Sequence, residues 1–293
     1  MTTINDVTDT AIWVAAYRAE ENERKNALFR DPYAKFLIGE KGDRLARRTQ
    51  GSRYTSWSVI IRTRIIDEFI LSLIKEEGIE LVLNLGAGLD TRPYRLSLPN
   101  ELEWIEVDFQ KIIDQKNEQL KSFSPVCQLE RIALDLSFGE DRKNLFQKVS
   151  NRSKKALVIT EGVIPYLSNK DAQALASDLF LQEKFLFWIT EYYSPEILNF
   201  LRTPKRLKQM ENAPFLFYPE DWFGFFKNLG WDQFETKYFG IESEKLGRMP
   251  PIPGWSKEIN QGDNSEDKKE VQQNVKRFLG YSILKKAFFF AEK

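Results

Sequence analysis

Apolar residues recur at two different spacings along this chain, and the two spacings separate predicted helices from predicted strands. Between residues 56 and 75 an apolar side chain stands at every third or fourth position, which predicts a long amphipathic helix. A shorter pattern of the same kind over residues 9–24 predicts an N-terminal helix with Thr8 or Asp9 as its N-cap. Seven strands are expected further on, at residues 81–85, 103–107, 128–133, 156–160, 184–190, 231–238 and 281–290. Helices are expected between most of them, at residues 109–121, 142–149, 170–181 and 220–229.

This alternation of strands and helices is typical of a mostly parallel sheet covered on both faces. The last two strands have no clear helix between them, because residues 254–273 are polar, charged and glycine-containing. An antiparallel last strand is the simplest use of such a connection. The sequence therefore predicts an α/β, Rossmann-like fold with a seven-stranded sheet, a helical N-terminal cap and a lid insertion. We expect one domain, with the cap at 1–78, a cofactor-binding core at 79–190, the lid at 191–218 and the rest of the core sheet at 219–293.

The first predicted strand ends in two glycines, and the second ends in an acid twenty residues later. Gly86 and Gly88 lack Cβ atoms, so the backbone on either side of Ala87 can turn sharply and a ligand can approach it closely. Asp108 ends the neighbouring strand, where a carboxylate can accept hydrogen bonds from both hydroxyls of a ribose. The pattern predicts a pocket for an adenosine-type cofactor.

The same turn departs from the dinucleotide fingerprint G-x-G-x-x-G, because Thr91 stands at the third glycine position. Asp90 also puts an acid where a pyrophosphate would sit, which is repulsive. Two roles suit Asp90 equally well, contact with the ligand and capping of the helix that follows. A cofactor without phosphates fits better, and S-adenosyl-L-methionine is the obvious one. An NAD(P)-dependent oxidoreductase and a noncatalytic cofactor-binding protein are the alternatives.

Three segments of the chain resemble the leucine carboxyl methyltransferase-like family of S-adenosylmethionine-dependent methyltransferases. They are NLGAGLDTR at residues 84–92, WIEVD at 104–108 and TEGVIPYL at 160–167. Residues 9–20 and 29–34 are similar to a bacterial branch of O-methyltransferases linked to polyketide-type metabolism. The resemblance implies the class I methyltransferase fold and S-adenosyl-L-methionine as cofactor.

The resemblance also implies roles for residues outside the glycine turn. Arg62 would grip the cofactor carboxylate, with a solvated place on its helix as the alternative. Glu161, at the end of the fourth strand, would face the methionine portion and in particular its ammonium group. Asp135 and Leu136 would hold the adenine, unless Asp135 caps the next helix instead. Tyr166 would orient the methyl acceptor, with packing of its ring as the alternative.

The chain contains no histidine, which excludes Ser-His-Asp, Cys-His and histidine-containing zinc chemistry. A carboxylate acceptor is already ionised at neutral pH and needs orientation and desolvation rather than a base, so the composition favours carboxyl methylation. A tyrosine, lysine or aspartate would be the base if the acceptor were a hydroxyl. Cys127 is the single cysteine, so the chain has no internal disulfide, and we expect a small buried side chain there.

The charge and hydropathy of the chain limit the kinds of partner that we expect. The 43 basic and 43 acidic residues cancel, so nothing draws the chain to nucleic acid or to an anionic membrane. The first residues lack a basic segment followed by an apolar core, and no apolar run approaches the ~20 residues of a membrane helix. We expect a cytoplasmic protein whose methyl acceptor is a small molecule, with a protein acceptor left open.

Overall fold

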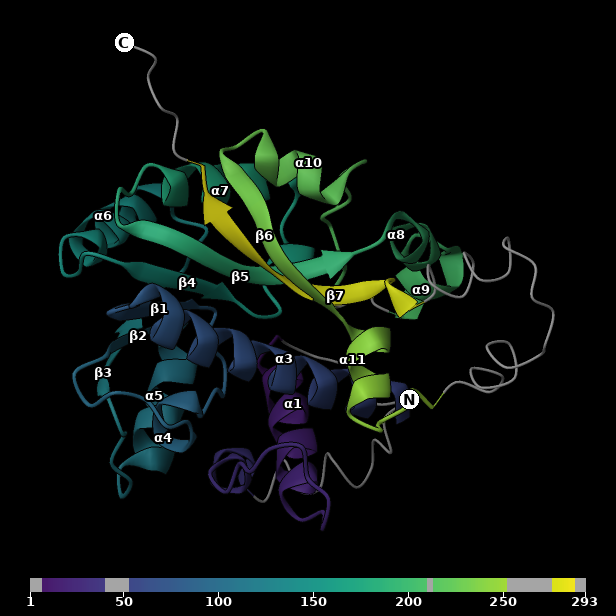
Figure 1. The fold of residues 1–293 in the computed structure, drawn as a ribbon, viewed down its shortest axis with the longest axis horizontal. Coiled ribbons are helices and arrows are strands. Elements are labelled where there is room, and N and C mark those ends of the chain that lie inside the picture. The colour runs from purple at the N-terminus through teal and green to yellow at the C-terminus, as the bar shows by residue number, and fades with distance from the viewer. Residues whose placement is uncertain (1–6, 40–52, 210–212, 252–275, 288–293) are drawn as a thin grey trace.

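A seven-stranded sheet crosses the middle of the molecule with helices on both faces, as Figure 1 shows. The computed structural model describes residues 7–39, 53–209, 213–251 and 276–287. The strands are β1 (Leu81–Leu85), β2 (Glu103–Asp108), β3 (Gln128–Ala133), β4 (Ala156–Thr160), β5 (Phe185–Tyr193), β6 (Trp231–Tyr238) and β7 (Leu279–Lys286), in the spatial order β3-β2-β1-β4-β5-β7-β6. The first five pair in parallel, and β7 lies between β5 and β6, antiparallel to both. The predicted mostly parallel sheet with an antiparallel last strand is confirmed.

Helices described by the structure follow most of the strands. They are α1 (Val7–Asn22), α3 (Arg53–Glu77), α4 (Arg92–Arg95), α5 (Gln110–Leu120), α6 (Gly139–Ser150), the 3-10 turn η1 (Ile164–Tyr166), α7 (Asn169–Phe180), α8 (Pro195–Leu201), α9 (Pro204–Gln209), α10 (Trp222–Lys227) and α11 (Phe239–Lys245). Successive side chains of a strand point to opposite faces, so both faces of a central strand need cover. In β1, Leu83 joins a core layer with α6, α7 and α10, whereas Val82 packs toward α3. The sheet therefore has two hydrophobic layers.

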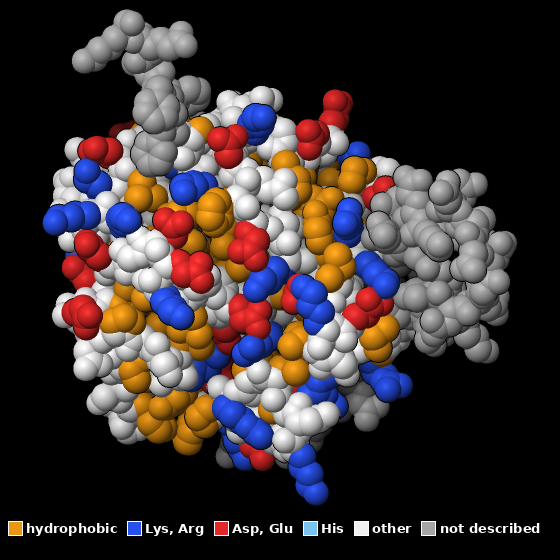
Figure 2. Space-filling model, in the orientation of Figure 1, with side chains coloured by type: hydrophobic (Ala, Val, Ile, Leu, Met, Phe, Trp, Pro, Cys, Tyr) orange, Lys and Arg blue, Asp and Glu red, His pale blue; other side chains and the backbone are white. Residues whose placement is uncertain are grey.

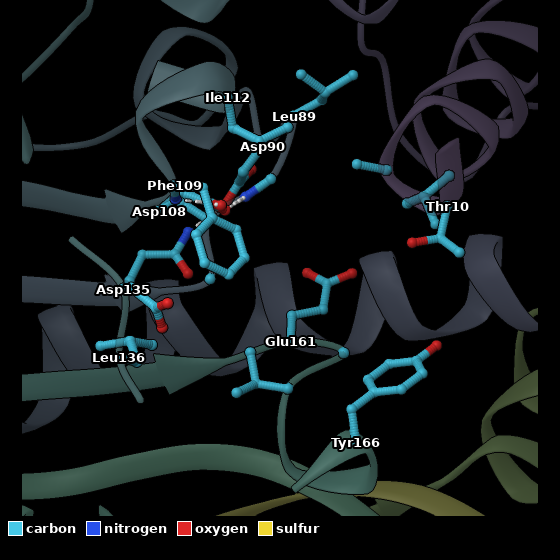
Figure 3. Close-up of a pocket in the computed structure, with 18 of the residues that line it drawn as sticks. Thr10, Leu89, Asp90, Asp108, Phe109, Ile112, Asp135, Leu136, Glu161 and Tyr166 are labelled. Atoms are coloured by element: carbon cyan, nitrogen blue, oxygen red, sulfur yellow. Dashed lines mark hydrogen bonds between the residues drawn. The ribbon is translucent and has the colours of Figure 1, made fainter. Parts of the chain in front are cut away.

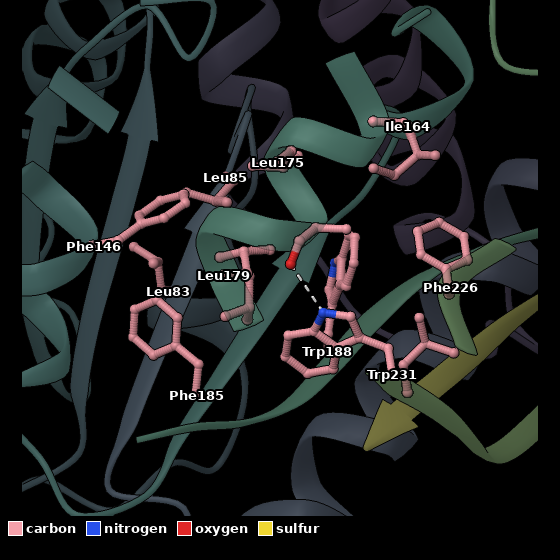
Figure 4. Close-up of a cluster of buried hydrophobic side chains, with 14 of the residues drawn as sticks. Leu83, Leu85, Phe146, Ile164, Leu175, Leu179, Phe185, Trp188, Phe226 and Trp231 are labelled. Atoms are coloured by element: carbon pink, nitrogen blue, oxygen red, sulfur yellow. Dashed lines mark hydrogen bonds between the residues drawn. The ribbon is translucent and has the colours of Figure 1, made fainter. Parts of the chain in front are cut away.

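Large aromatic residues fill the first of these layers. Trp188 on β5 packs edge-on against Phe226 of α10 and Trp231 of β6, with ring centroids 5.2 and 5.5 Å apart (Figure 4). All three side chains are fully buried. This packing joins α10 and β6 to β5, which pairs in parallel with β4, and the carboxyl end of β4 carries part of the site described below.

Several predictions about individual elements and their boundaries are wrong. A helix, α11, follows β6 directly, because Phe239 packs edge-on against Trp57 and stacks on Tyr281, contacts that the sequence pattern does not show. Strand β5 continues to Tyr193, so residues 191–193 belong to the sheet and not to an insertion. The expected N-caps at residues 8 and 9 lie inside α1. The polar residues 254–273 fall outside the described residues.

Two helices, α8 and α9, occupy the region after β5 where we expect a lid insertion, and the role of this segment as a lid stays a prediction. On the face of the molecule in Figure 2, basic and acidic side chains are interspersed, in keeping with the equal numbers of each in the chain. Within the described residues, no helix combines the length and the apolar character that a membrane crossing needs.

Candidate active site

A cavity of about 490 Å³ opens at the carboxyl ends of the parallel strands (Figure 3). Its walls come from the loops after β1, β2, β3 and β4 and from the side of α1. The structure brings together in this one cavity all ten residues that the sequence singles out: Arg62, Gly86, Ala87, Gly88, Asp90, Asp108, Asp135, Leu136, Glu161 and Tyr166. Parallel strands point their carboxyl ends to one edge, which is where open α/β sheets bind ligands.

The glycine turn after β1 forms the floor of the cavity. Gly86 and Gly88 have φ angles of +65° and +48°, a left-handed conformation that other residues rarely adopt. A Cβ atom on Gly86 would lie 2.6 Å from Cγ2 of Val163, so a side chain has no room there. The amides of Gly86 and Ala87 both donate to the Val107 carbonyl, at 2.8 and 3.1 Å. Both glycines are therefore required by the backbone itself.

Asp108 stands at the tip of β2 with its carboxylate fixed from two sides. The Gly88 amide donates to Oδ2 and the Phe109 amide donates to Oδ1, each at 2.7 Å. Burial raises the pKa of Asp108, while these two hydrogen bonds work in the opposite direction. A carboxylate has about four acceptor sites, so Asp108 keeps capacity for further donors from a ligand in the cavity.

Asp90 is neutralised by an arginine two residues away. Nη1 of Arg92 lies 2.9 Å from Asp90 Oδ2, and the Arg92 amide donates to Oδ1 at 2.9 Å. The guanidinium of Arg92 holds the pKa of Asp90 well below its usual range, although burial opposes this. Asp90 thus accepts a hydrogen bond from the first amide of α4, although Thr91 is the N-cap residue, and Asp90 also lines the cavity. Its negative charge is compensated inside the protein, which the sequence pattern does not reveal.

Arg62 and Glu161 form an ion pair at the other end of the cavity. Arg62 Nε lies 2.9 Å from Glu161 Oε1, and Arg92 Nη1 lies 2.8 Å from Glu161 Oε2. The two arginines hold the pKa of Glu161 below its usual value against the effect of burial. The Arg62 side chain is 20% exposed, so the alternative of a solvated surface arginine is wrong. This end of the cavity presents the cationic Arg62 and the anionic Glu161 side by side.

The remaining predicted residues lie at opposite ends of the cavity. The Asp135 carboxylate accepts a hydrogen bond from the Ser137 amide at 2.9 Å, so this residue shapes the turn after β3 as well as lining the cavity. Tyr166 on η1 packs its ring edge-on against Phe215, with centroids 5.1 Å apart. Burial raises the pKa of Tyr166, which keeps its hydroxyl protonated at neutral pH. In Figure 3, Tyr166 faces Thr10 across the cavity.

The sequence missed several charged residues that hold this site together. Arg18 on α1 lines the cavity and pairs with Asp31 at 2.8 Å, and its guanidinium also donates to the Leu89 carbonyl. Asp67 on α3 pairs with Arg92 and with Arg95, each at 2.7 Å. Hydrophobic periodicity carries no signal for such pairs, because the partners are 13 to 28 residues apart and meet only in the folded chain.

Residues 11–180 match the family model described as leucine carboxyl methyltransferase. The chain belongs to the leucine carboxyl methyltransferase family. A proposed S-adenosyl-L-methionine-dependent methyltransferase of Streptomyces avermitilis is 32% identical over 184 residues, which are 59% of this chain and 64% of that protein. A second such protein, from Streptomyces coelicolor, is 30% identical over 177 residues, or 57% of this chain and 62% of that protein. The matches thus span less than two thirds of these relatives.

Solved structures similar to this leucine carboxyl methyltransferase family member cover nearly its whole length. A DUF574 family protein from Streptomyces avermitilis has a TM-score of 0.58 at 14% identity and covers 94% of this chain and 97% of its own. A proposed methyltransferase from Thermobifida fusca has a TM-score of 0.56 at 16% identity, with 95% and 94% covered. At these identities the likeness establishes the fold, including the C-terminal strands beyond the family match.

Proposed function

We propose that this member of the leucine carboxyl methyltransferase family is an S-adenosyl-L-methionine-dependent O-methyltransferase that methylates a carboxylate of a small molecule. The observation that carries the proposal is the division of one cavity into two chemically different ends. Asp108 stands among apolar side chains at one end, and the Arg62–Glu161 ion pair stands at the other. A nucleoside joined to an amino acid has the same two halves.

The first end fits an adenosine. Ribose hydroxyls would donate to the free acceptor sites of Asp108, whose position the glycine turn already fixes. Phe109, Leu134 and Leu136 supply apolar walls for a flat base, and Asp135 offers an acceptor for an exocyclic amino group. Arg92 compensates the charge of Asp90, so the choice between S-adenosyl-L-methionine and a cofactor with a pyrophosphate depends on the other end of the cavity.

The second end fits the amino-acid half of the cofactor. The guanidinium of Arg62 would bind the carboxylate, and Glu161 would accept from the ammonium. Arg92 stays with Glu161 and keeps it anionic, so a bound ammonium would meet a charged partner. A ligand that carries both charges would leave the local balance of charge unchanged, which is favourable in a buried site.

S-adenosyl-L-methionine supplies, when bound, a methyl group whose bond to sulfur breaks as its bond to the acceptor oxygen forms, so the sulfonium and carboxylate charges disappear together. The protein would orient the acceptor and exclude water. Burial raises the pKa of Tyr166, so this residue acts as a hydrogen-bond donor rather than a base. Glu161 is engaged by two arginines and its pKa is lowered, which makes it a poor proton acceptor. An acceptor that is already ionised suits this end of the cavity.

Calorimetry with S-adenosyl-L-homocysteine tests the cofactor, comparing the wild type with Asp108→Ala and Arg62→Ala. We expect micromolar binding that both substitutions weaken by about tenfold or more. A folded wild type that binds NAD and does not bind S-adenosyl-L-homocysteine would support an oxidoreductase and overturn the proposal.

Incubation with S-adenosyl-L-methionine and a set of small carboxylates, with methyl esters as the measured product, tests the reaction. Cofactor binding without ester formation would favour a noncatalytic cofactor-binding protein.

A further inference from the structure

Glu191, near the end of β5, is a buried carboxyl group beside the cavity, and hydrogen-bond donors from three segments converge on it. It is 3% exposed. The Gly162 amide and, at 3.3 Å, the Tyr281 hydroxyl donate to its Oε1. The Thr190 hydroxyl donates to Oε2 at 3.1 Å. Glu191 is absent from the cavity lining, so it is placed to support the site rather than to touch a ligand.

The hydrogen bond from Thr190 is the last in a row of consecutive hydrogen bonds that starts in the core. Nε1 of Trp188 donates to the Thr160 hydroxyl at 2.9 Å, and that hydroxyl donates to the Thr190 hydroxyl at 3.1 Å. Each hydroxyl receives one hydrogen bond and gives the next, so the row has a single direction that ends at Glu191. The end of such a row requires an acceptor, which the carboxyl group of Glu191 supplies.

The bond from Gly162 connects this row to the cofactor end of the cavity. Strand β4 ends at Thr160, Glu161 follows, and the chain then turns at Gly162 with φ of +72°. The next residue, Val163, packs so closely on the glycine turn that a Cβ on Gly86 would meet it at 2.6 Å. The peptide between Glu161 and Gly162 is therefore held by Glu191 while its neighbours contact both halves of the site.

We propose that Glu191 is a positioning residue, which aims Glu161 at the amino-acid half of the cofactor by holding the Gly162 amide. This inference rests on the proposed function, because it assigns Glu161 to the cofactor ammonium. A shift of the Gly162 peptide would turn Glu161 away from Arg62 and from a bound ammonium. It would leave Asp108 and the adenosine end in place, since Asp108 belongs to β2 and the apolar walls for the base follow β2 and β3.

Two ligands that differ only in the amino-acid half separate this role from a general effect on folding. S-adenosyl-L-homocysteine carries that half, and 5′-methylthioadenosine has the same adenosine and sulfur without it. Glu191→Ala is expected to lower the affinity for S-adenosyl-L-homocysteine by about tenfold and the affinity for 5′-methylthioadenosine by less than about threefold. Glu191→Gln keeps an oxygen that accepts from Gly162 and should restore most of the affinity. Glu191→Asp withdraws the carboxylate by one methylene and should behave like Glu191→Ala if the alanine variant does not fold.

Glu242→Ala is a matched control, because Glu242 is also a buried carboxyl group but lies on α11 outside the cavity lining. It should leave both affinities unchanged. The double variant Glu161→Gln, Glu191→Ala should bind no more weakly than Glu161→Gln alone, because the two residues would act through one contact. An equal loss of affinity for both ligands in the Glu191 variants would overturn the positioning role. A wild type that binds neither ligand would overturn the proposed function instead.

Discussion

At the scale of single residues, the chain shows where the ligand-facing groups stand but not which partners neutralise them. The sequence places Asp108 correctly at a strand end, because a strand and the polar residue that ends it are neighbours in the chain. It leaves two roles open for Asp90, and the deciding partner is the Arg92 side chain, whose direction depends on the packing of α4. Motif spacing predicts where these acidic residues stand in the chain. Their charge states depend on partners that only the folded structure shows.

Asp108 gives the most direct prediction about pH. Burial raises its pKa, so the carboxylate takes up a proton as the pH falls through that raised value and loses its ability to accept from a ribose. The affinity for S-adenosyl-L-homocysteine should therefore fall as the solution is acidified from neutral pH. Asp108→Asn should bind about tenfold more weakly at neutral pH and lose this pH dependence. Titration calorimetry at several pH values measures both effects, and a variant as pH-sensitive as the wild type would contradict the assignment.

Cys127 gives a prediction about reactivity. It is 7% exposed, and burial raises the pKa of its thiol to about 12. Since the thiolate is the reactive form, the folded protein should resist alkylation by iodoacetamide at a pH of about 8, near the usual pKa of a free thiol. The same reagent should modify the chain completely in denaturant. Mass spectrometry of both samples is the measurement, and rapid modification of the folded protein would show that the thiol is accessible.

At the scale of elements, buried ion pairs join helices that the sequence pattern treats as separate. The Thr91 hydroxyl at the start of α4 donates to Asp31 at 2.7 Å, and Asp31 also pairs with Arg18 of α1. Asp67 of α3 pairs with two arginines of α4. The lengths of α1 and α3 follow from apolar periodicity, but their attachment to the cavity follows from these pairs. That is why the sequence predicts the helices and misses the way they close the site.

Asp67→Asn tests this attachment. The substitution leaves Arg92 and Arg95, both 3% exposed in their side chains, without their shared anion. Removing one partner of a buried ion pair typically costs about 3–5 kcal/mol, so the free energy of unfolding in urea should fall by that amount. Glu68→Gln is the control on the same helix, because Glu68 is 29% exposed and pairs with surface groups, and it should cost under about 1 kcal/mol. Similar losses in both variants would rule out a special role for the Asp67 pairs.

At the scale of the whole molecule, the order of strands and helices was predictable because each strand is a short apolar run bounded by turn residues. The antiparallel β7 followed from the polar connection before it. Helix α11 was not predictable, because it depends on contacts of Phe239 with Trp57 and Tyr281, which are distant in the chain. The cavity-lining residues that follow strands β1, β2, β3 and β4 were predictable from motifs at strand ends. The hydrogen bonds of Glu191 were not, since Gly162 follows β4 and Tyr281 lies on β7, both distant from Glu191 in the chain.

The buried charges predict how the stability of the whole molecule depends on pH. The pKa values of Asp31, Asp90 and Glu161 are lowered in the folded protein, in each case by arginines that outweigh burial. Carboxyl groups of this kind stabilise the fold above their unfolded pKa of about 4, and that contribution is lost as the pH falls through their folded values. The melting temperature should therefore drop steeply below a pH of about 4.

Asp108 and Glu191 act in the opposite direction, because their pKa values are raised by burial. Their protonated forms favour the fold, so their contribution is present at low pH and is lost as the pH rises through the raised values. Asp90→Asn should separate the two groups: it should lower the melting temperature at neutral pH and flatten its decline in acid. Calorimetric melting across the acid range measures this. An unchanged acid slope in Asp90→Asn would mean that the arginines around the cavity do not depend on Asp90 for their charge balance.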